Sequence, residues 1–277
     1  MATSLRTTLA DAKASRVPTA SAETSVAGVW ALGRIECRKM VTHPALWIGM
    51  AFAVLLLRGV IGAGAVDDFW ESAAWVMGSV LFGLIIGTIL TANVAALRPR
   101  RDHMKELYGS LPSPPEARTA GVFTGLMLGP VLISLVLTAL GWWVFKHIPN
   151  IEDRYAIDGF LAVQVPLTVL ALGAIAIAVG RWIPTLLGGP VIIFTQFMTP
   201  LIWAVPWFMP RSFDGLPLGG ARETWHLTYF AAVITTWVAL ALARDRRTVW
   251  RFAIAGGALA LGIYAAFHQL PPGYFDE

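Results

Sequence analysis

The sequence predicts an all-helical, polytopic integral membrane protein with about seven transmembrane helices. Of the 277 residues, 56% are hydrophobic and only 14% are charged, and a water-soluble domain cannot bury that much apolar surface. Seven apolar stretches approach the roughly 20 residues with which a helix crosses the hydrocarbon core of a bilayer. The lone cysteine, Cys37, excludes a disulfide framework and a cysteine-based metal cluster.

The chain begins with a polar segment that contains no apolar run. Residues 1–25 are rich in Ala, Ser and Thr, and we expect them to be a disordered cytoplasmic tail. A secretory signal would need an apolar core, and Asp11 and Glu23 count against the alternative of a transit peptide.

Residues 26–43 show helical periodicity beside basic side chains. Apolar or small residues recur three or four positions apart at Val26, Trp30, Gly33, Cys37 and Met40. The pattern predicts an amphipathic helix that lies in the cytoplasmic interface of the membrane. A short cytoplasmic lead into the first span is the alternative.

The membrane domain, residues 44–270, contains the seven predicted spans. They cover residues 44–64, 73–97, 121–145, 159–180, 188–209, 225–243 and 252–270. The fifth contains Pro190, Pro200 and Pro206, and proline interrupts the backbone hydrogen bonds of a helix. A broken or re-entrant segment in place of one full crossing is therefore the alternative, which leaves six or seven spans.

The lysine and arginine residues predict the orientation of these spans. Residues 1–43, 98–120, 181–187 and 244–251 hold 16 of the 21, whereas the loops on the opposite side hold four. Positively charged loops stay in the cytoplasm. We therefore expect a multi-pass protein of the cell (plasma) membrane with a cytoplasmic N-terminus and, after seven crossings, an extracellular tail at residues 271–277.

The second predicted span carries a stripe of small residues, one at every fourth position. They are Ser79, Gly83, Gly87, Thr91 and Ala95. Such a stripe lets a second helix approach closely in lipid, where no hydrophobic drive brings helices together. It predicts a helix contact, either within the chain or with a second copy, and it places Leu84 toward lipid.

Polar residues within two predicted spans are candidates for a substrate path. Thr195, Gln196 and Thr199 lie in the middle of the fifth span, directly before Pro200, which frees backbone carbonyl groups. This combination favours a cavity lining, and hydrogen bonding between helices is the alternative. Arg58 lies about 9 Å from the outer end of the first span. It either reaches the interface or an acidic residue of the next loop, or it contacts an anionic substrate or lipid.

The sequence lacks the motifs of several common functions. No GxxxxGK[ST] occurs, so the chain has no P-loop for ATP, and the five histidines include no HxxxH or HExxH pair. No nucleic-acid motif is present, and no Asp or Glu lies within the predicted spans, where ion-driven transporters usually keep a coupling carboxylate. We therefore expect no enzyme activity, no bound cofactor or metal and no nucleic-acid partner. If the protein moves a molecule uphill, the energy must come from a partner chain.

The most distinctive segment is the predicted cytoplasmic loop at residues 98–120. A charged helical run extends from Arg101 to Tyr108, and a stop follows that is formed by Gly109, Leu111, Pro112, Pro114 and Pro115. Arg118 then leads into the third span. A short helix held on the cytoplasmic side of the membrane between two spans is a suitable contact site for a cytoplasmic ATPase that moves those spans.

This loop resembles that of a transporter family. The charged run with ELYGSLPSPPEART resembles the loop after the second span in permeases of the type-2 family of ATP-binding-cassette (ABC) exporters. The segments AIAIAVGRWIP, WHLTYF and RDRR resemble actinobacterial members, and the likeness covers most of the chain. The family core has six spans with both ends inside, so the seventh span here would be an addition to a six-helix permease core.

The resemblance implies a permease subunit that works with other chains. A separate ABC ATPase subunit would bind ATP and Mg, and a second permease chain, identical or related, would complete a central path lined by the second and fifth spans. The ATPase would act through Arg101, Lys105, Glu106, Leu107, Leu111, Pro112 and Arg118. The implied activity is export of an amphipathic or hydrophobic substrate, such as a drug, a natural product or a lipid. A membrane-anchored assembly or sensory subunit that transports nothing is the alternative.

Overall fold

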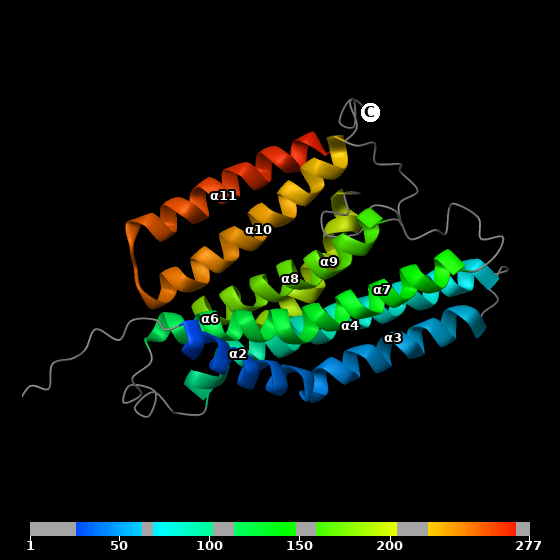
Figure 1. The fold of residues 1–277 in the computed structure, drawn as a ribbon, viewed down its shortest axis with the longest axis horizontal. Helices are drawn as coiled ribbons and strands as arrows, with labels where there is room; N and C mark the ends of the chain where they lie inside the picture. Colours follow the sequence, from blue (N-terminus) through cyan, green and yellow to red (C-terminus); the bar gives the residue numbers. More distant parts are fainter. Residues whose placement is uncertain (1–25, 63–68, 102–113, 148–158, 204–220, 270–277) are drawn as a thin grey trace, which may run out of the picture.

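The computed structural model describes residues 26–62, 69–101, 114–147, 159–203 and 221–269. Within these ranges the regular elements are all helices, and the described part of each of the seven predicted apolar stretches lies on them (Figure 1), apart from Gln269 directly after α11. The elements are α2 (Val26–Val41), α3 (Pro44–Gly62), α4 (Phe69–Arg101), α6 (Pro115–Leu126), the π-helical turn η1 (Met127–Val131), α7 (Leu132–His147), α8 (Gly159–Trp182), α9 (Gly188–Trp203), α10 (Ala221–Asp245) and α11 (Val249–His268). The all-helical class is confirmed for this part of the chain. The predicted tails at residues 1–25 and 271–277 lie outside it.

Among the described residues, four helical segments are long and apolar enough to cross a membrane. They are Pro115–Trp143, Val163–Trp182, Glu223–Asp245 and Val249–His268. A shorter apolar segment covers Phe82–Arg98, and α9 has 16 residues. These helices indicate a multi-pass membrane protein. Seven crossings, and the orientation of the two ends, stay predictions.

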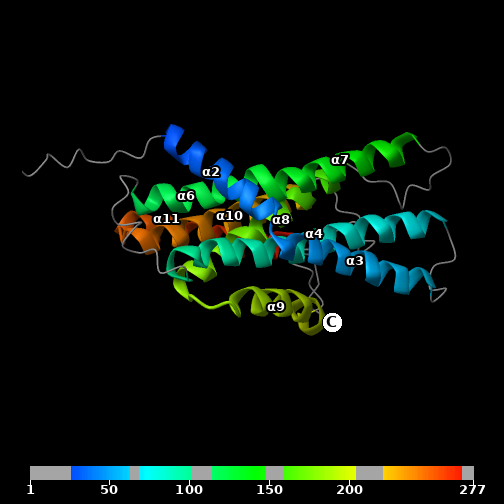
Figure 2. The ribbon, with the colours of Figure 1, turned by 90° about the horizontal axis from the view of Figure 1, so that it is seen from below.

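Helix α8 lies at the centre of the bundle. It packs against α4, α7, α9 and α10, and Figure 2 shows α9 along the outside beside α4. The small, fully buried side chains of Ala174, Ala176 and Ala178 let the neighbouring helices approach α8 closely. Helix α11 is peripheral, because it packs mainly on α10 and leaves most of its apolar side chains exposed (Figure 1).

The small-residue stripe of α4 lies against α3 of the same chain. A Cβ atom added to Gly87 would lie 2.7 Å from Leu46 Cα, and one added to Gly49 would lie 2.5 Å from the carbonyl oxygen of Gly83. Both distances are too short for a real side chain, so glycine is required where the two backbones meet. Thr91 is buried and donates its hydroxyl hydrogen to the carbonyl oxygen of Gly87 at 2.9 Å.

Predictions were also made for two other positions of α4. The side chain of Ser79 lies outside the described part of the chain. The prediction that Leu84 faces lipid is wrong, because its side chain is fully buried with Leu46 and Val169. Helix α4 packs against both α3 and α8, so a position away from the stripe still faces protein.

Helix α2 packs against α6 and η1 through glycines of both partners. A Cβ atom on Gly33 would lie 2.4 Å from Thr124 Cγ2, and one on Gly125 would lie 2.7 Å from the Cβ atom of Glu36. Gly121, Gly125 and Gly129 recur at every fourth position along this contact. This second stripe was not predicted, although its spacing is the same as that of the stripe in α4.

The predicted stripe of α2 is buried only in part. Gly33 and Met40 are buried, whereas Val26 and Trp30 are 73% and 49% exposed. Cys37 is partly buried, and this burial raises the pKa of its thiol above the ordinary value. Burial therefore lowers the fraction of this thiol that is ionised at neutral pH.

The third predicted span is one continuous helical segment that contains a π-helical turn, which is wider than a turn of α-helix. Helices α6 and α7 are joined by η1, which contains Pro130. Proline has no backbone N–H and its ring crowds the carbonyl group four residues earlier, so a local widening lets the helix continue. Gly129, in the same turn, lies close to Cys37 and Val41 of α2, so the wide turn coincides with the α2 contact.

Candidate functional site

A cavity of about 590 Å³ lies between α8, α9, α10 and α11. Its wall contains Ile175 of α8, Gln196 of α9, Trp237 of α10 and Phe267 of α11, so it brings together four segments that are far apart in the sequence. Pockets for drug-sized molecules have volumes of roughly 300–1,000 Å³. The cavity is therefore large enough for an organic ligand.

The lining of the cavity is apolar with a few uncharged polar groups. Thr195, Gln196, Tyr229 and Thr236 contribute polar atoms, and the described wall contains no Lys, Arg, Asp or Glu. The hydroxyl groups of Thr195 and Thr236 donate to backbone carbonyl oxygens of their own helices at 2.9 and 2.8 Å. The side chains of Gln196 and Trp237 make no hydrogen bond to other residues in the described part, so their N–H groups are available to a ligand.

The structure brings two of the four predicted substrate-path residues together. Thr195 and Gln196 are neighbours on α9 and both line the cavity. Thr199 lies on the same helix, but its side chain is outside the described part. Arg58 is an exposed residue of α3, and neither α3 nor α4 contributes to the described wall of the cavity.

Most of the predicted ATPase-coupling residues lie outside the described residues. These are Lys105, Glu106, Leu107, Leu111 and Pro112. Arg101 is the last residue of α4, and its side chain is also outside the described part. Arg118 lies half-buried near the start of α6. Pro114 has an extended backbone (φ −64°, ψ 153°) directly before Pro115 begins that helix, which is the role that proline favours at a helix start.

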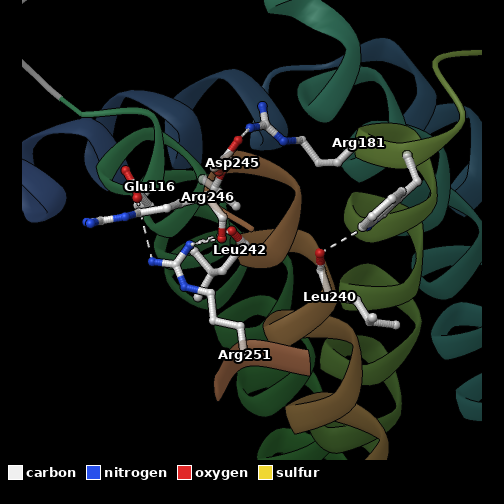
Figure 3. Close-up of polar contacts among 9 residues, drawn as sticks. Glu116, Arg181, Leu240, Leu242, Asp245, Arg246 and Arg251 are labelled. Atoms are coloured by element: carbon white, nitrogen blue, oxygen red, sulfur yellow. Dashed lines mark hydrogen bonds and ion pairs between the residues drawn. The ribbon is translucent and has the colours of Figure 1, made fainter. Parts of the chain in front are cut away.

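Polar contacts connect the helix ends on both sides of this loop. Glu36 of α2 forms an ion pair with Arg98 of α4 at 2.6 Å. Asp245, at the end of α10, accepts hydrogen bonds from Arg181 of α8 and Thr119 of α6, and Figure 3 shows the pair with Arg181. The Asp245 carboxylate therefore connects α6, α8 and α10.

Arg251 connects α11 to two further helices. Its Nη2 atom lies 3.6 Å from Oε1 of Glu116 in the first turn of α6. Its Nη1 atom donates to the carbonyl oxygens of Leu242 at 2.6 Å and Arg246 at 3.2 Å (Figure 3). A cation placed on the last carbonyl groups of a helix satisfies them and complements the helix dipole. We call the region formed by the ends of α4, α8 and α10 and the starts of α6 and α11 the basic end.

The ion pairs of the basic end were not predicted. In the sequence, Arg98, Arg181 and Arg251 indicate only the orientation of the spans. The ion pairs could have been predicted from three acidic residues that lie within the predicted basic segments. These residues are Glu36, Glu116 and Asp245. An acid in such a segment favours pairing between helix ends.

Asn93 is a buried polar residue of α4 that was also not predicted. Its amide nitrogen donates to the carbonyl oxygens of Thr185 at 3.3 Å and Leu186 at 3.5 Å, in the turn between α8 and α9. A Cβ atom on Gly180 would lie 2.8 Å from Asn93 Oδ1, so the end of α8 packs closely on the amide. Asn93 therefore positions α9, and with it Gln196, against the bundle.

A buried contact holds α10 and α11 together at the ends that lie farthest from the basic end. His226 Nδ1 lies 2.5 Å from Oε1 of Gln269, and both side chains are fully buried. The His226 ring also stacks on that of Tyr229, with ring centroids 6.4 Å apart. Because Tyr229 lines the cavity, this contact supports the wall formed by α10 and α11.

Neither a metal cluster nor a relative identifies the chemistry of this chain. Within the described ranges, no group of three or more His, Cys, Asp or Glu side chains could hold a metal ion. Comparisons of the chain with known protein families, with curated proteins and with solved structures find no match.

Proposed function

We propose that the chain is the permease subunit of an ATP-driven exporter of the ABC type, and that it moves an uncharged amphipathic or hydrophobic molecule. A drug, a natural product or a lipid has this chemistry. The observation that supports the proposal is the cavity at Thr195 and Gln196, which lies among apolar helices and has no charged residue in its described wall. Ion pathways through membranes usually use rings of charge or of carbonyl groups.

The cavity suggests how such a molecule would be held. Ile175 and Phe267 would contact its apolar body, since burial of apolar surface is the main favourable term. The amide of Gln196 and the indole N–H of Trp237 would donate to an acceptor at its polar end and so orient it. A charged molecule would lose its hydration without gaining a counter-charge.

The driving force in this proposal comes from a separate ATPase that pushes on the loop at residues 98–120. The chain has no P-loop motif of its own. The loop joins α4 to α6, and the helix ends beside it are connected to α8, α10 and α11 through Asp245 and Arg251. A movement of the loop would therefore reach the helices that form the cavity wall.

The first test concerns the ATPase. We expect the tagged chain, purified from membranes of its native host, to retain a protein that contains GxxxxGK[ST]. Leu107→Asp with Leu111→Asp should abolish this copurification while membrane insertion persists, because two apolar anchors worth on the order of 2 kcal/mol each are lost. Arg101→Gln with Lys105→Gln, at two other predicted coupling residues, is the comparison and should weaken copurification only mildly, since surface ion pairs contribute about 0–1 kcal/mol each. Retention of the ATPase and of export by the leucine variant would contradict the coupling role.

The second test concerns the cavity. With the copurified ATPase in proteoliposomes, we expect ATP-dependent export of the uncharged dye Nile red. Gln196→Ala with Trp237→Phe should lower the export rate about tenfold, the effect of losing roughly 1.4 kcal/mol of ligand interaction. Arg58→Gln, outside the cavity, is the matched control and should export at the normal rate. A complex that binds the ATPase but exports nothing would favour the assembly or sensory subunit.

A further inference from the structure

The turn between α10 and α11 carries three arginines that form no ion pair in the described part of the chain. They are Arg244, Arg246 and Arg247. The nearby acids have other partners, because Asp245 pairs with Arg181 and Glu116 pairs with Arg251. The turn therefore keeps positive charge that the described acids do not neutralise, and Arg246 and Arg247 are exposed.

Two tryptophans beside these charges are typical of the headgroup level of a membrane. The guanidinium carbon of Arg244 lies 5.8 Å from the centre of the Trp182 ring, and the Trp182 indole donates to the carbonyl oxygen of Leu240 at 2.9 Å. Trp250, which is 58% exposed, lies on the other side of the turn beside Arg251. Tryptophan side chains favour the boundary between acyl chains and headgroups.

An apolar surface continues from the turn along α11. Val249 is 87% exposed, and Phe252 and Ile254 are more than a third exposed. Helix α11 packs mainly on α10, so this face of α11 is not covered by the described part of the protein. A ligand with a charged head and apolar chains would match both the turn and this face.

We propose that the α10–α11 turn binds the phosphate headgroup of an anionic phospholipid, with the exposed Arg246 and Arg247 at the phosphate and the acyl chains along α11. Arginine suits this role, because its fork of N–H donors matches phosphate oxygens and its charge attracts an anionic headgroup. The apolar face favours a lipid over a soluble phosphate. The site does not depend on the proposed transport function.

The test compares lipids by their effect on the thermal unfolding of the full chain in detergent. We expect dioleoyl phosphatidylglycerol to raise the Tm by several degrees more than dioleoyl phosphatidylcholine, because a ligand that binds only the folded state stabilises it. Inorganic phosphate and glycerol phosphate should have no effect. Arg246→Gln with Arg247→Gln should remove most of the shift, whereas Arg34→Gln with Arg38→Gln, which removes the same charge from the exposed side of α2, should keep it.

Three outcomes would overturn the proposal. Equal losses in the two double variants would mean diffuse attraction to any basic surface, and an equal shift with inorganic phosphate would mean a soluble-anion site. A turn variant that keeps its lipid response but loses a copurifying protein would mean that the turn binds a protein. Native mass spectrometry of the unmodified chain covers the case in which the variant fails to fold. We expect it to retain phosphatidylglycerol at least about tenfold over phosphatidylcholine, and equal retention would also refute the site.

Discussion

Asp245 is the residue whose side chain makes the most consequential polar contacts at the basic end. It accepts hydrogen bonds from Arg181 and Thr119, and its side chain is only 5% exposed. Arg181 is 19% exposed. Water therefore screens this pair weakly, and loss of one partner would leave the other charge partly buried.

We expect Asp245→Asn to lower the free energy of unfolding by on the order of 3 kcal/mol, the typical cost of removing one partner of a buried ion pair. Thermal unfolding in detergent, followed by circular dichroism, measures this loss. Arg34→Gln, on the exposed side of α2, is the control and should change stability by less than about 0.5 kcal/mol. Arg181→Gln added to Asp245→Asn should restore part of the loss, and strictly additive effects would show that the two residues do not interact.

Single residues of the cavity could be predicted only where they differ from their apolar neighbours. Thr195 and Gln196 were predicted to line a cavity, because polar side chains are unfavourable in lipid and usually face the protein interior or a cavity. Tyr229 and Trp237 lie on another helix, and no local pattern indicates that they face α9. Side-chain contacts between distant segments depend on how the helices pack, which the residue types alone do not specify.

At the scale of elements, glycines decide which helices pack most closely. The stripe of α4 meets α3 at Gly49 and Leu46, and the stripe of α6 and η1 meets α2 at Gly33. In contrast, no atom lies within 4 Å of a Cβ atom placed on Gly256 or Gly257 of α11. Among the described glycines, those that meet a neighbouring helix are therefore expected to be sensitive to substitution, whereas those of α11 that face open space are not.

We expect Gly87→Ala to destabilise the protein by roughly 1–3 kcal/mol, because the added methyl group forces α3 and α4 apart. Gly257→Ala is the matched control. It should be neutral or stabilise by up to about 1 kcal/mol, since alanine favours a helix more than glycine does. Unfolding measured in the same detergent compares the two directly. If Gly87→Ala proved as harmless as Gly257→Ala, the close contact of α3 with α4 would not exist in the protein.

The elements themselves were predictable to a large extent, and their contacts were not. The predicted apolar stretches lie on helices over nearly all of their described residues, because length and composition are local properties. The wide turn at Pro130 was not predicted, since a proline in an apolar run signals an interruption but not its form. The burial of Leu84 was not predicted either, because a stripe shows one packed face and does not exclude a second.

At the scale of the whole molecule, the described helix ends that border three of the four predicted cytoplasmic segments, 98–120, 181–187 and 244–251, gather at one end. The ends of α4, α8 and α10 and the starts of α6 and α11 lie there (Figure 1). The alternation of inside and outside loops along the chain stays a prediction. The prediction that this end faces the cytoplasm rests only on the excess of Lys and Arg in these segments.

We expect an N-terminus in the cytoplasm and a C-terminus outside the cell, after seven crossings. Single cysteines placed at Ser4 and at Tyr274, in a Cys37→Ala background, test this in intact cells with a membrane-impermeant thiol reagent. Both positions lie outside the described residues. The cysteine at 274 should be labelled and the one at 4 should react only after the cells are opened. The reverse pattern would mean the opposite orientation, and labelling of both or of neither would mean an even number of crossings.

The peripheral position of α11 affects how the protein must be handled. Helix α11 is attached mainly through α10, and in a bilayer its exposed apolar side chains would be in contact with lipid. Such a helix owes much of its stability to the surrounding solvent, whereas α8 owes its stability to its neighbours. A harsh detergent should therefore release α11 while the rest of the bundle stays folded. Because α11 forms one wall of the cavity, a preparation that has lost this helix would retain its circular dichroism spectrum almost unchanged and still fail to bind ligand.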